Sequence, residues 1–117
     1  MPHRAIVAKE LAGLLGVLAH PQRIRIIEEL RGGERNVMSI QAALEISHSG
    51  VSQHLMNLRA HRLVTERREG RQVYYHLRHP DLARWLTDAM RFMELESVEA
   101  DQLRKAIKKT HADWVSK

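Results

Sequence analysis

Residues 48–60 have the composition of a helix that contacts nucleic acid. Their polar side chains are mostly hydroxyls, amides and histidines, and the stretch contains no Asp or Glu. Glutamine can pair bidentately with adenine in the major groove, and serine bonds to bases or to phosphates. This stretch is therefore the first candidate functional surface. The candidate contacts on it are His48, Ser49, Ser52, Gln53, His54 and Asn57.

Three arginines, Arg67, Arg68 and Arg71, surround Gly70. Guanidinium groups hold phosphates and enter narrow minor grooves. β-Prone runs on either side predict a hairpin over residues 63–77, with residues 66–71 at its tip, where Gly70 permits a tight turn. An arginine-rich tip is also often only a solvated loop, so this second candidate depends on the first.

A third candidate is a metal site. His76, His79 and Asp81 have a spacing that could ligate zinc together with a residue of a second subunit. The alternative, which we favour, is that His76 faces outward on the hairpin while Asp81 caps the next helix. We therefore expect no metal and no other cofactor, with zinc as the less favoured alternative.

Histidines on or beside the candidate helix indicate a possible response to pH. His48, His54 and His61 lie there, and histidine is the residue type whose unperturbed pKa, about 6.5, lies near physiological pH. Protonation would place additional positive charge next to phosphates. We therefore expect nucleic-acid affinity to differ between pH 6 and pH 8.

Enzymatic function is not supported by the sequence. The chain has 117 residues and no cysteine, so thiolate metal sites and cysteine nucleophiles are excluded. It contains neither a glycine-rich phosphate loop nor a credible Ser-His-Asp arrangement. Because it also lacks an apolar run long enough to cross a bilayer, we expect a cytoplasmic protein that has no membrane partner and is not an enzyme.

Hydrophobic periodicity predicts the elements that position these groups. Within residues 48–60, Val51, Leu55 and Leu58 share one face and should enter the core, which leaves Ser49 and Gln53 on the opposite face. A row of Ile24, Ile27 and Leu30 should point inward on the second helix. Helices are predicted at residues 5–18, 21–31, 39–44, 48–60, 82–93 and 98–114, with a strand stub at 37–38.

Two short helices joined by a tight turn over residues 39–60, followed by a basic hairpin over 63–77, form a winged helix-turn-helix. The predicted fold class is therefore mainly α with a small β-hairpin, in one domain over residues 1–117. The distribution of charge along the chain also favours this segment as the binding surface. Residues 41–80 hold six Arg against three Glu, whereas residues 81–100 hold two Arg against five acids. The middle of the chain is thus the better surface for an anionic partner.

Three motifs in order resemble the ArsR/SmtB family of prokaryotic winged-helix repressors. They are the sequences LAHPQRIRII at residues 18–27, SHSGVSQHL at 47–55 and EGRQVYY at 69–75. The resemblance implies a homodimer that binds an inverted-repeat DNA operator, with residues 1–18 and 80–114 as dimerisation helices. The interface residues that it implies are Leu11, Leu14, Leu15, Leu82, Trp85, Leu86, Ala89, Met90 and Met93.

The chain departs from the metal-sensing pattern of that family. Asn36 and Met38 stand where the resemblance places a Cys-x-Cys site, and Phe92 and Leu95 stand where it places the second pair of zinc ligands. Arg62 replaces a glycine that often follows the recognition helix in a left-handed conformation.

The sequence therefore predicts a homodimeric, sequence-specific DNA-binding regulator, most simply a repressor. Its effector is unknown, and a thiolate-bound metal is not expected. The alternative is a dimeric protein-interaction module of the same fold that has lost specific DNA binding.

Overall fold

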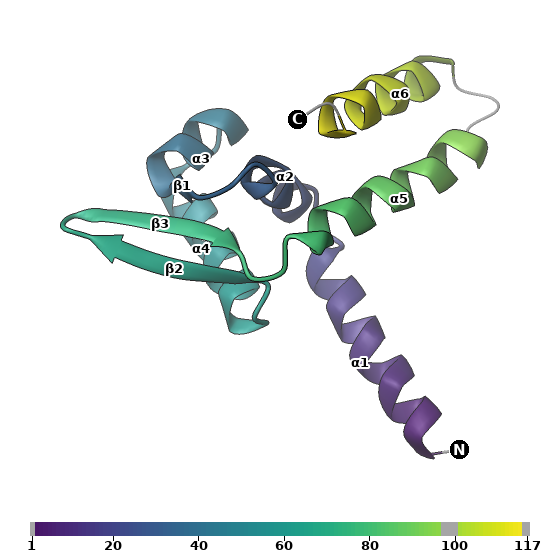
Figure 1. The fold of residues 1–117 in the computed structure, drawn as a ribbon, viewed down its shortest axis with the longest axis horizontal. Helices are drawn as coiled ribbons and strands as arrows, with labels where there is room; N and C mark the ends of the chain where they lie inside the picture. Colours follow the sequence, from purple (N-terminus) through teal and green to yellow (C-terminus); the bar gives the residue numbers. More distant parts are fainter. Residues whose placement is uncertain (1, 97–100, 116–117) are drawn as a thin grey trace. The chain divides into compact units, whose positions relative to one another are not determined.

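The computed structural model describes residues 2–96 and 101–115. The chain divides into two compact units, Met1–His79 and Pro80–Lys117, whose elements Figure 1 labels. None of the helices in the described ranges is both long and apolar enough to cross a membrane. The first unit contains α1 (Pro2–Leu18), α2 (Pro21–Leu30), β1 (Arg35–Asn36), α3 (Val37–Leu44), α4 (His48–Ala60), β2 (Val64–Glu69) and β3 (Gln72–Leu77), and the second contains α5 (Asp81–Glu96) and α6 (Asp101–Val115).

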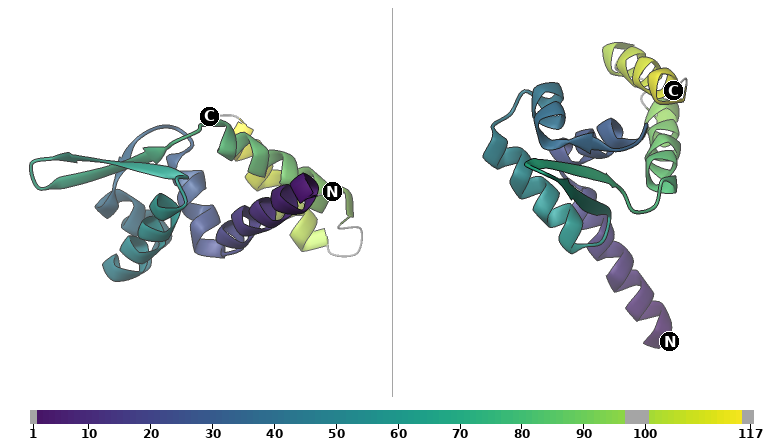
Figure 2. Two further views of the ribbon diagram at one scale, coloured as in Figure 1. Left: turned by 90° about the horizontal axis from the view of Figure 1, so that it is seen from below. Right: turned by 60° about the vertical axis from the view of Figure 1, so that its left-hand side comes forward.

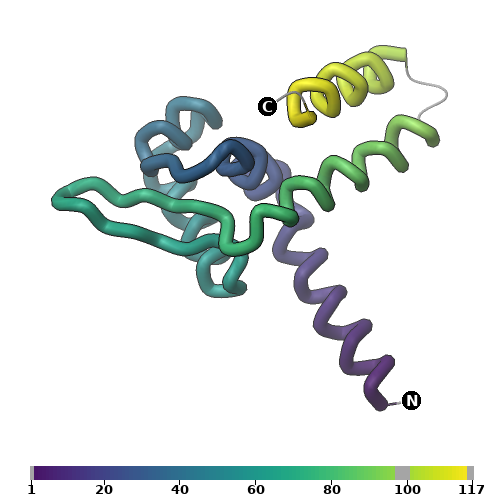
Figure 3. The backbone as a smooth tube through the Cα atoms, in the orientation of Figure 1, coloured from purple at the N-terminus to yellow at the C-terminus, as the bar shows by residue number. Residues whose placement is uncertain are grey.

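The three strands form one antiparallel sheet in the order β1-β3-β2. β2 and β3 make a long ribbon that extends beyond the helices of the first unit (Figure 3). α1 extends away from the other helices of the first unit in a different direction from this ribbon, as two further views show (Figure 2). The predicted winged helix-turn-helix is confirmed, with α3 and α4 as the helix pair and β2–β3 as the wing.

The core of the first unit is aliphatic. Val51, Leu55 and Leu58 are completely buried, as predicted. The prediction for α2 was wrong at one position, because Ile24 is 37% exposed and Ile26 is fully buried. The buried residues of α2 are Ile26, Ile27 and Leu30, a stripe that is turned slightly around the helix from the predicted row because it packs against both α3 and α4.

The predicted strand stub at residues 37–38 was also wrong. Asn36 is the N-cap of α3, and its side-chain oxygen accepts a hydrogen bond from the backbone N–H of Ser39 at 2.8 Å. This cap starts the helix at Val37, because it satisfies an N–H group that the first turn leaves unpaired. The short strand β1 precedes it, at Arg35–Asn36.

The wing differs from its predicted form at the tip. β2 continues to Glu69 and pairs with Gln72 of β3, so only Gly70 and Arg71 form the turn. Gly70 has φ of 61°, a left-handed value that suits the first position of a two-residue hairpin turn. Arg67 therefore lies within a strand and not at the tip, and its direction is set by strand alternation.

Both ends of α4 have defined backbone geometry. Ser47 caps its start, and its Oγ accepts the backbone N–H of Gly50 at 3.1 Å. Glu45, in the turn before α4, has φ of 57°, and Arg62, just after α4, has φ of 59°. The expectation of a left-handed residue at position 62 is thus confirmed, although the residue is not glycine.

The side chains of α1 are buried only at its C-terminal end. Val17 and Leu18 are buried, whereas Ile6, Val7 and Leu11 are exposed. In the second unit, α5 and α6 pack against each other. The predicted last helix began at Val98, which lies outside the described residues, and α6 is described from Asp101.

Candidate nucleic-acid interface

α4 presents the polar face that its sequence predicts. Ser49 and Gln53 are exposed on the side opposite the buried Val51 and Leu55. Asn57 is half-buried, and its side-chain nitrogen donates to the backbone oxygen of Gln53 at 3.0 Å. No acidic residue lies in the first turn of the helix. This face therefore offers hydroxyl and amide groups to a partner, without negative charge.

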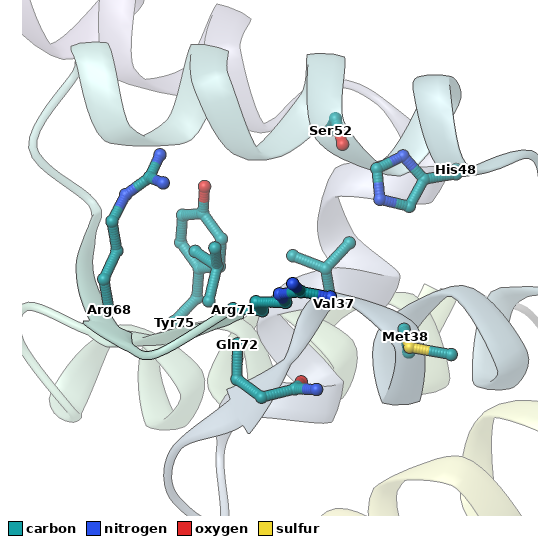
Figure 4. A pocket seen from close by; sticks show the side chains of 9 residues that line it. Val37, Met38, His48, Ser52, Arg68, Arg71, Gln72 and Tyr75 are labelled. Atoms are coloured by element: carbon teal, nitrogen blue, oxygen red, sulfur yellow. The ribbon is translucent and has the colours of Figure 1, made fainter.

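The polar face of α4 and the wing share one hollow of about 330 Å³. His48 and Ser52 line it from α4, while Arg68 and Arg71 line it from the wing. Figure 4 shows the side chains of these two elements facing one another across the space. Sequence reasoning predicted the two groups separately, and the fold brings part of each group together.

The two faces of the wing have different partners. Glu66 and Tyr75 are paired across the two strands, so their side chains lie on the same face of the wing, and strand alternation puts Arg68 on that face too. We call this face the helix-side face. The opposite face, which we call the outer face, carries Arg67 and Tyr74. Neighbouring arginines thus point to opposite sides of one ribbon.

Arg67 is held on the outer face by carboxylates. Its Nε and Nη2 donate to the two oxygens of Glu34 at 3.0 and 2.7 Å, and its Nη1 donates to Glu69 at 2.7 Å. Its guanidinium carbon lies 4.7 Å from the centroid of the Tyr74 ring. The hydrogen bond from Arg67 lowers the pKa of Glu34, and the two carboxylates raise the pKa of Arg67. Arg67 was predicted as a phosphate contact beside Arg68, but the structure separates the two because the tip is shorter than predicted.

Arg68 instead shares a carboxylate with the recognition helix. Glu66 accepts Nε of Arg68 at 3.1 Å, Nη1 of Arg59 at 2.9 Å and the hydroxyl of Tyr75 at 3.0 Å. We call these four residues the Glu66 cluster. Sequence reasoning missed it, because Arg59 and Glu66 are separated by the turn that ends the helix. The sequence signal was the presence of two acids, Glu66 and Glu69, among the arginines of residues 66–71.

His54, a predicted DNA contact, makes its observed contacts within the protein. Its Nδ1 accepts Nε of Arg23 at 3.2 Å, and its ring packs edge-to-face against His20, with centroids 4.7 Å apart. His54 thus bonds within the protein, at the start of α2. Burial, together with the positive charge of its neighbours His20 and Arg23, lowers the pKa of His54.

The candidate zinc ligands do not assemble within one chain. His76 lies exposed on the wing, and its ring nitrogens lie 2.6 and 3.0 Å from Oγ1 of Thr65. In the described part of the chain, no three His, Asp or Glu side chains are grouped to hold a metal ion. His79 and Asp81 belong to different units, and zinc bound together with a residue of a second subunit stays the less favoured alternative.

Several residues implied for dimerisation are accessible in the single chain. On α1, Leu11 and Leu15 are exposed, and on α5, Trp85 and Met93 are exposed, Trp85 by 41%. On each helix these apolar side chains are therefore accessible to a second chain. The other interface residues, Leu14, Leu82, Leu86 and Met90, are half-buried, and Ala89 is exposed.

The chain is similar to named transcriptional repressors. It is 43% identical over 70 residues to the transcriptional repressor SmtB homolog of Synechocystis sp., covering 60% of this chain and 53% of that protein. It is 37% identical over 70 residues to the transcriptional repressor PagR of Bacillus anthracis, covering 59% of this chain and 70% of that protein. The chain thus matches only about half of the first relative's length.

A solved structure and a family model agree with these relatives. The homodimeric winged helix-turn-helix DNA-binding domain Mb0332 of Mycobacterium bovis superimposes with a TM-score of 0.69 at 29% identity, covering 86% of this chain and 94% of that chain. Residues 20–66 match the family model described as "Bacterial regulatory protein, arsR family". Members of this family are regulators and not enzymes. The chain therefore belongs to the ArsR family of bacterial regulatory proteins.

Proposed function

We propose that the chain is a homodimeric transcriptional repressor that binds an inverted-repeat DNA operator through α4 and the wing. One observation carries this proposal. His48 and Ser52 of α4, a helix without acidic residues, and two wing arginines, Arg68 and Arg71, line the same hollow. On the same helix, the exposed Ser49 and Gln53 offer hydroxyl and amide groups that can bond to base edges, while the wing guanidinium groups bind phosphates.

The proposed dimer rests on exposed apolar surface and on the family. α1 exposes Leu11 and Leu15, which a second copy would cover, and the similar domain Mb0332 is described as homodimeric. Two recognition helices related by a twofold axis would contact half-sites about one helical turn apart. The proposal names no effector. A thiolate-bound metal is not expected, because Asn36 and Met38 stand where the family resemblance places the cysteines.

The first test is the selection of duplexes from a random pool by the purified protein, followed by binding measurements over a range of salt concentrations. We expect an inverted repeat to be enriched and the logarithm of its binding constant to fall with the logarithm of salt concentration, by about 0.9 for each phosphate contact. A dimer that enriches no sequence would contradict the proposal and support the protein-interaction module instead. Metal analysis, with and without chelator, tests the zinc alternative.

The second test is Gln53→Ala, on the exposed face of α4. We expect this substitution to relax preference at one base pair per half-site, at a cost of about 1–3 kcal/mol in discrimination, because a bidentate amide contact is lost. Gln102→Ala, at an exposed position of α6, is the matched control. Equal loss of affinity on all duplexes would show that Gln53 does not contact bases.

A further inference from the structure

The Glu66 cluster joins the two elements that line the hollow. Arg59 lies in the last turn of α4, Arg68 lies in β2 and Tyr75 lies in β3. All three donate to one carboxylate, with donor–acceptor distances between 2.9 and 3.1 Å. The side chain of Glu66 is only 12% exposed. A carboxylate this enclosed needs several donors to offset the loss of water.

The cluster has one fixed centre and one accessible arm. Arg68 uses Nε for the bond to Glu66, while 72% of its side chain is exposed. Among the described residues, its two terminal nitrogens, Nη1 and Nη2, donate no hydrogen bond to another residue. Figure 4 shows the guanidinium directed from β2 toward α4, beside the hydroxyl of Tyr75. The inner side of the guanidinium is thus anchored, and the outer side is available to a ligand.

Glu66 is suited to hold its donors as an anion. Burial raises the pKa of Glu66, but the hydrogen bonds from Tyr75 and Arg68, with the charges of Arg59 and Arg68, lower it overall. Burial and the hydrogen bond to the carboxylate in turn raise the pKa of the Tyr75 hydroxyl. At neutral pH the centre is therefore a carboxylate, and the phenol remains a donor.

We propose that Glu66 is a positioning residue for operator specificity, which fixes the wing relative to the recognition helix and aims Arg68 at a phosphate. This inference rests on the proposed DNA binding. A wing tied to α4 places its cation at one distance from the base-reading face, so a phosphate contact forms only when α4 is in register with its bases. A free wing would find phosphates on any duplex.

Removal of an acid beside DNA also raises affinity for all sequences, since it increases the net positive charge. The informative quantity is therefore the ratio of operator to non-operator affinity, which cancels this general effect. A variant that merely folds less stably keeps this ratio when it is measured well below its unfolding temperature. The ratio thus separates positioning from both charge and stability.

The experiment compares Glu66→Gln with Glu69→Gln on the selected inverted repeat and on a scrambled duplex of equal length. Both variants remove one negative charge from β2, but Glu69 contacts Arg67 in the described structure and lies outside the Glu66 cluster. We expect Glu66→Gln to lower the affinity ratio about tenfold and the operator salt slope by about 0.9 per subunit. We expect Glu69→Gln to keep both values.

Tyr75→Phe is the second variant, in case Glu66→Gln does not fold. It removes one donor to the carboxylate and retains the ring, and we expect a smaller drop in the ratio, of about threefold. A normal ratio in a folded Glu66→Gln protein, or in Tyr75→Phe if the first variant is unfolded, would overturn the role of Glu66 alone. A wild-type protein with no operator preference would overturn the proposed function as well.

Discussion

The helix-side face and the outer face of the wing carry the same residue types in different arrangements. On the helix-side face, Arg68 bonds to Glu66 through one nitrogen and keeps its other end accessible. On the outer face, Arg67 donates from all three nitrogens to Glu34 and Glu69. Adjacent arginines thus differ in their availability to phosphates. Net charge in a segment does not measure how much of that charge a ligand can use.

The largest expected effect comes from removal of the available cations. Arg68→Ala combined with Arg71→Ala should weaken binding to every duplex by at least about tenfold and lower the salt slope by about 1.8 per subunit, because two phosphate contacts are lost. Fluorescence anisotropy over a salt series measures both values. Lys105→Ala with Lys109→Ala, on exposed α6 positions, is a control of equal charge. An unchanged slope in the wing variant would remove these residues from the interface.

A smaller effect is expected on the outer face. Arg67→Ala should change operator affinity by less than about twofold and leave the salt slope as it is, because exposed pairs of this kind contribute little. The same anisotropy series detects the difference. If the slope fell as it does for Arg68→Ala, Arg67 would be exchanging its carboxylates for phosphate, and the distinction between the two faces would fail.

The smallest expected effect is on the pH dependence of the free energy of unfolding. It compares two histidines with different surroundings, His54 at the α2–α4 contact and His76 on the outer face. Because the folded-state pKa of His54 is lowered, the unfolded chain takes up its proton first as pH falls. Its contribution to the free energy of unfolding is therefore complete above about pH 6.5 and is lost as pH falls below that value. Urea unfolding at pH 8 and pH 5.5 should show this loss.

His54→Gln should reduce the dependence of unfolding free energy on pH, whereas His76→Gln should leave it in place. An unchanged dependence in His54→Gln would mean that other groups cause it. Operator affinity of His54→Gln, measured at pH 6 and pH 8, then tests the predicted pH response with His48 and His61 still present.

Local patterns were sufficient to predict the helices and the polar face of α4. The orientation of α4 followed from Val51, Leu55 and Leu58, since three apolar residues at helical spacing define a single buried side. The cap at Ser47 and the turn at Gly70 also depend on neighbouring residues alone. These features required no knowledge of distant parts of the chain.

The partners of the wing arginines could not be predicted in this way. Side chains alternate along a strand, so a shift of one residue in the predicted strand register moves an arginine to the opposite face. The bond between Glu34 and Arg67 spans 33 positions, and the bond between Arg23 and His54 spans 31. Such pairs arise only when separate elements pack together, and neither composition nor periodicity contains that information.

Two residues with left-handed backbone conformation, Glu45 and Arg62, lie on either side of α4. Glu45 ends α3 as its C-cap, Ser47 caps the start of α4, and Arg62 follows its end, so specific residues bound the helix on both sides. An inserted residue would rotate every later side chain by about 100°. In this protein, the cap at Ser47 and the buried side of α4 together fix the direction in which its glutamine points.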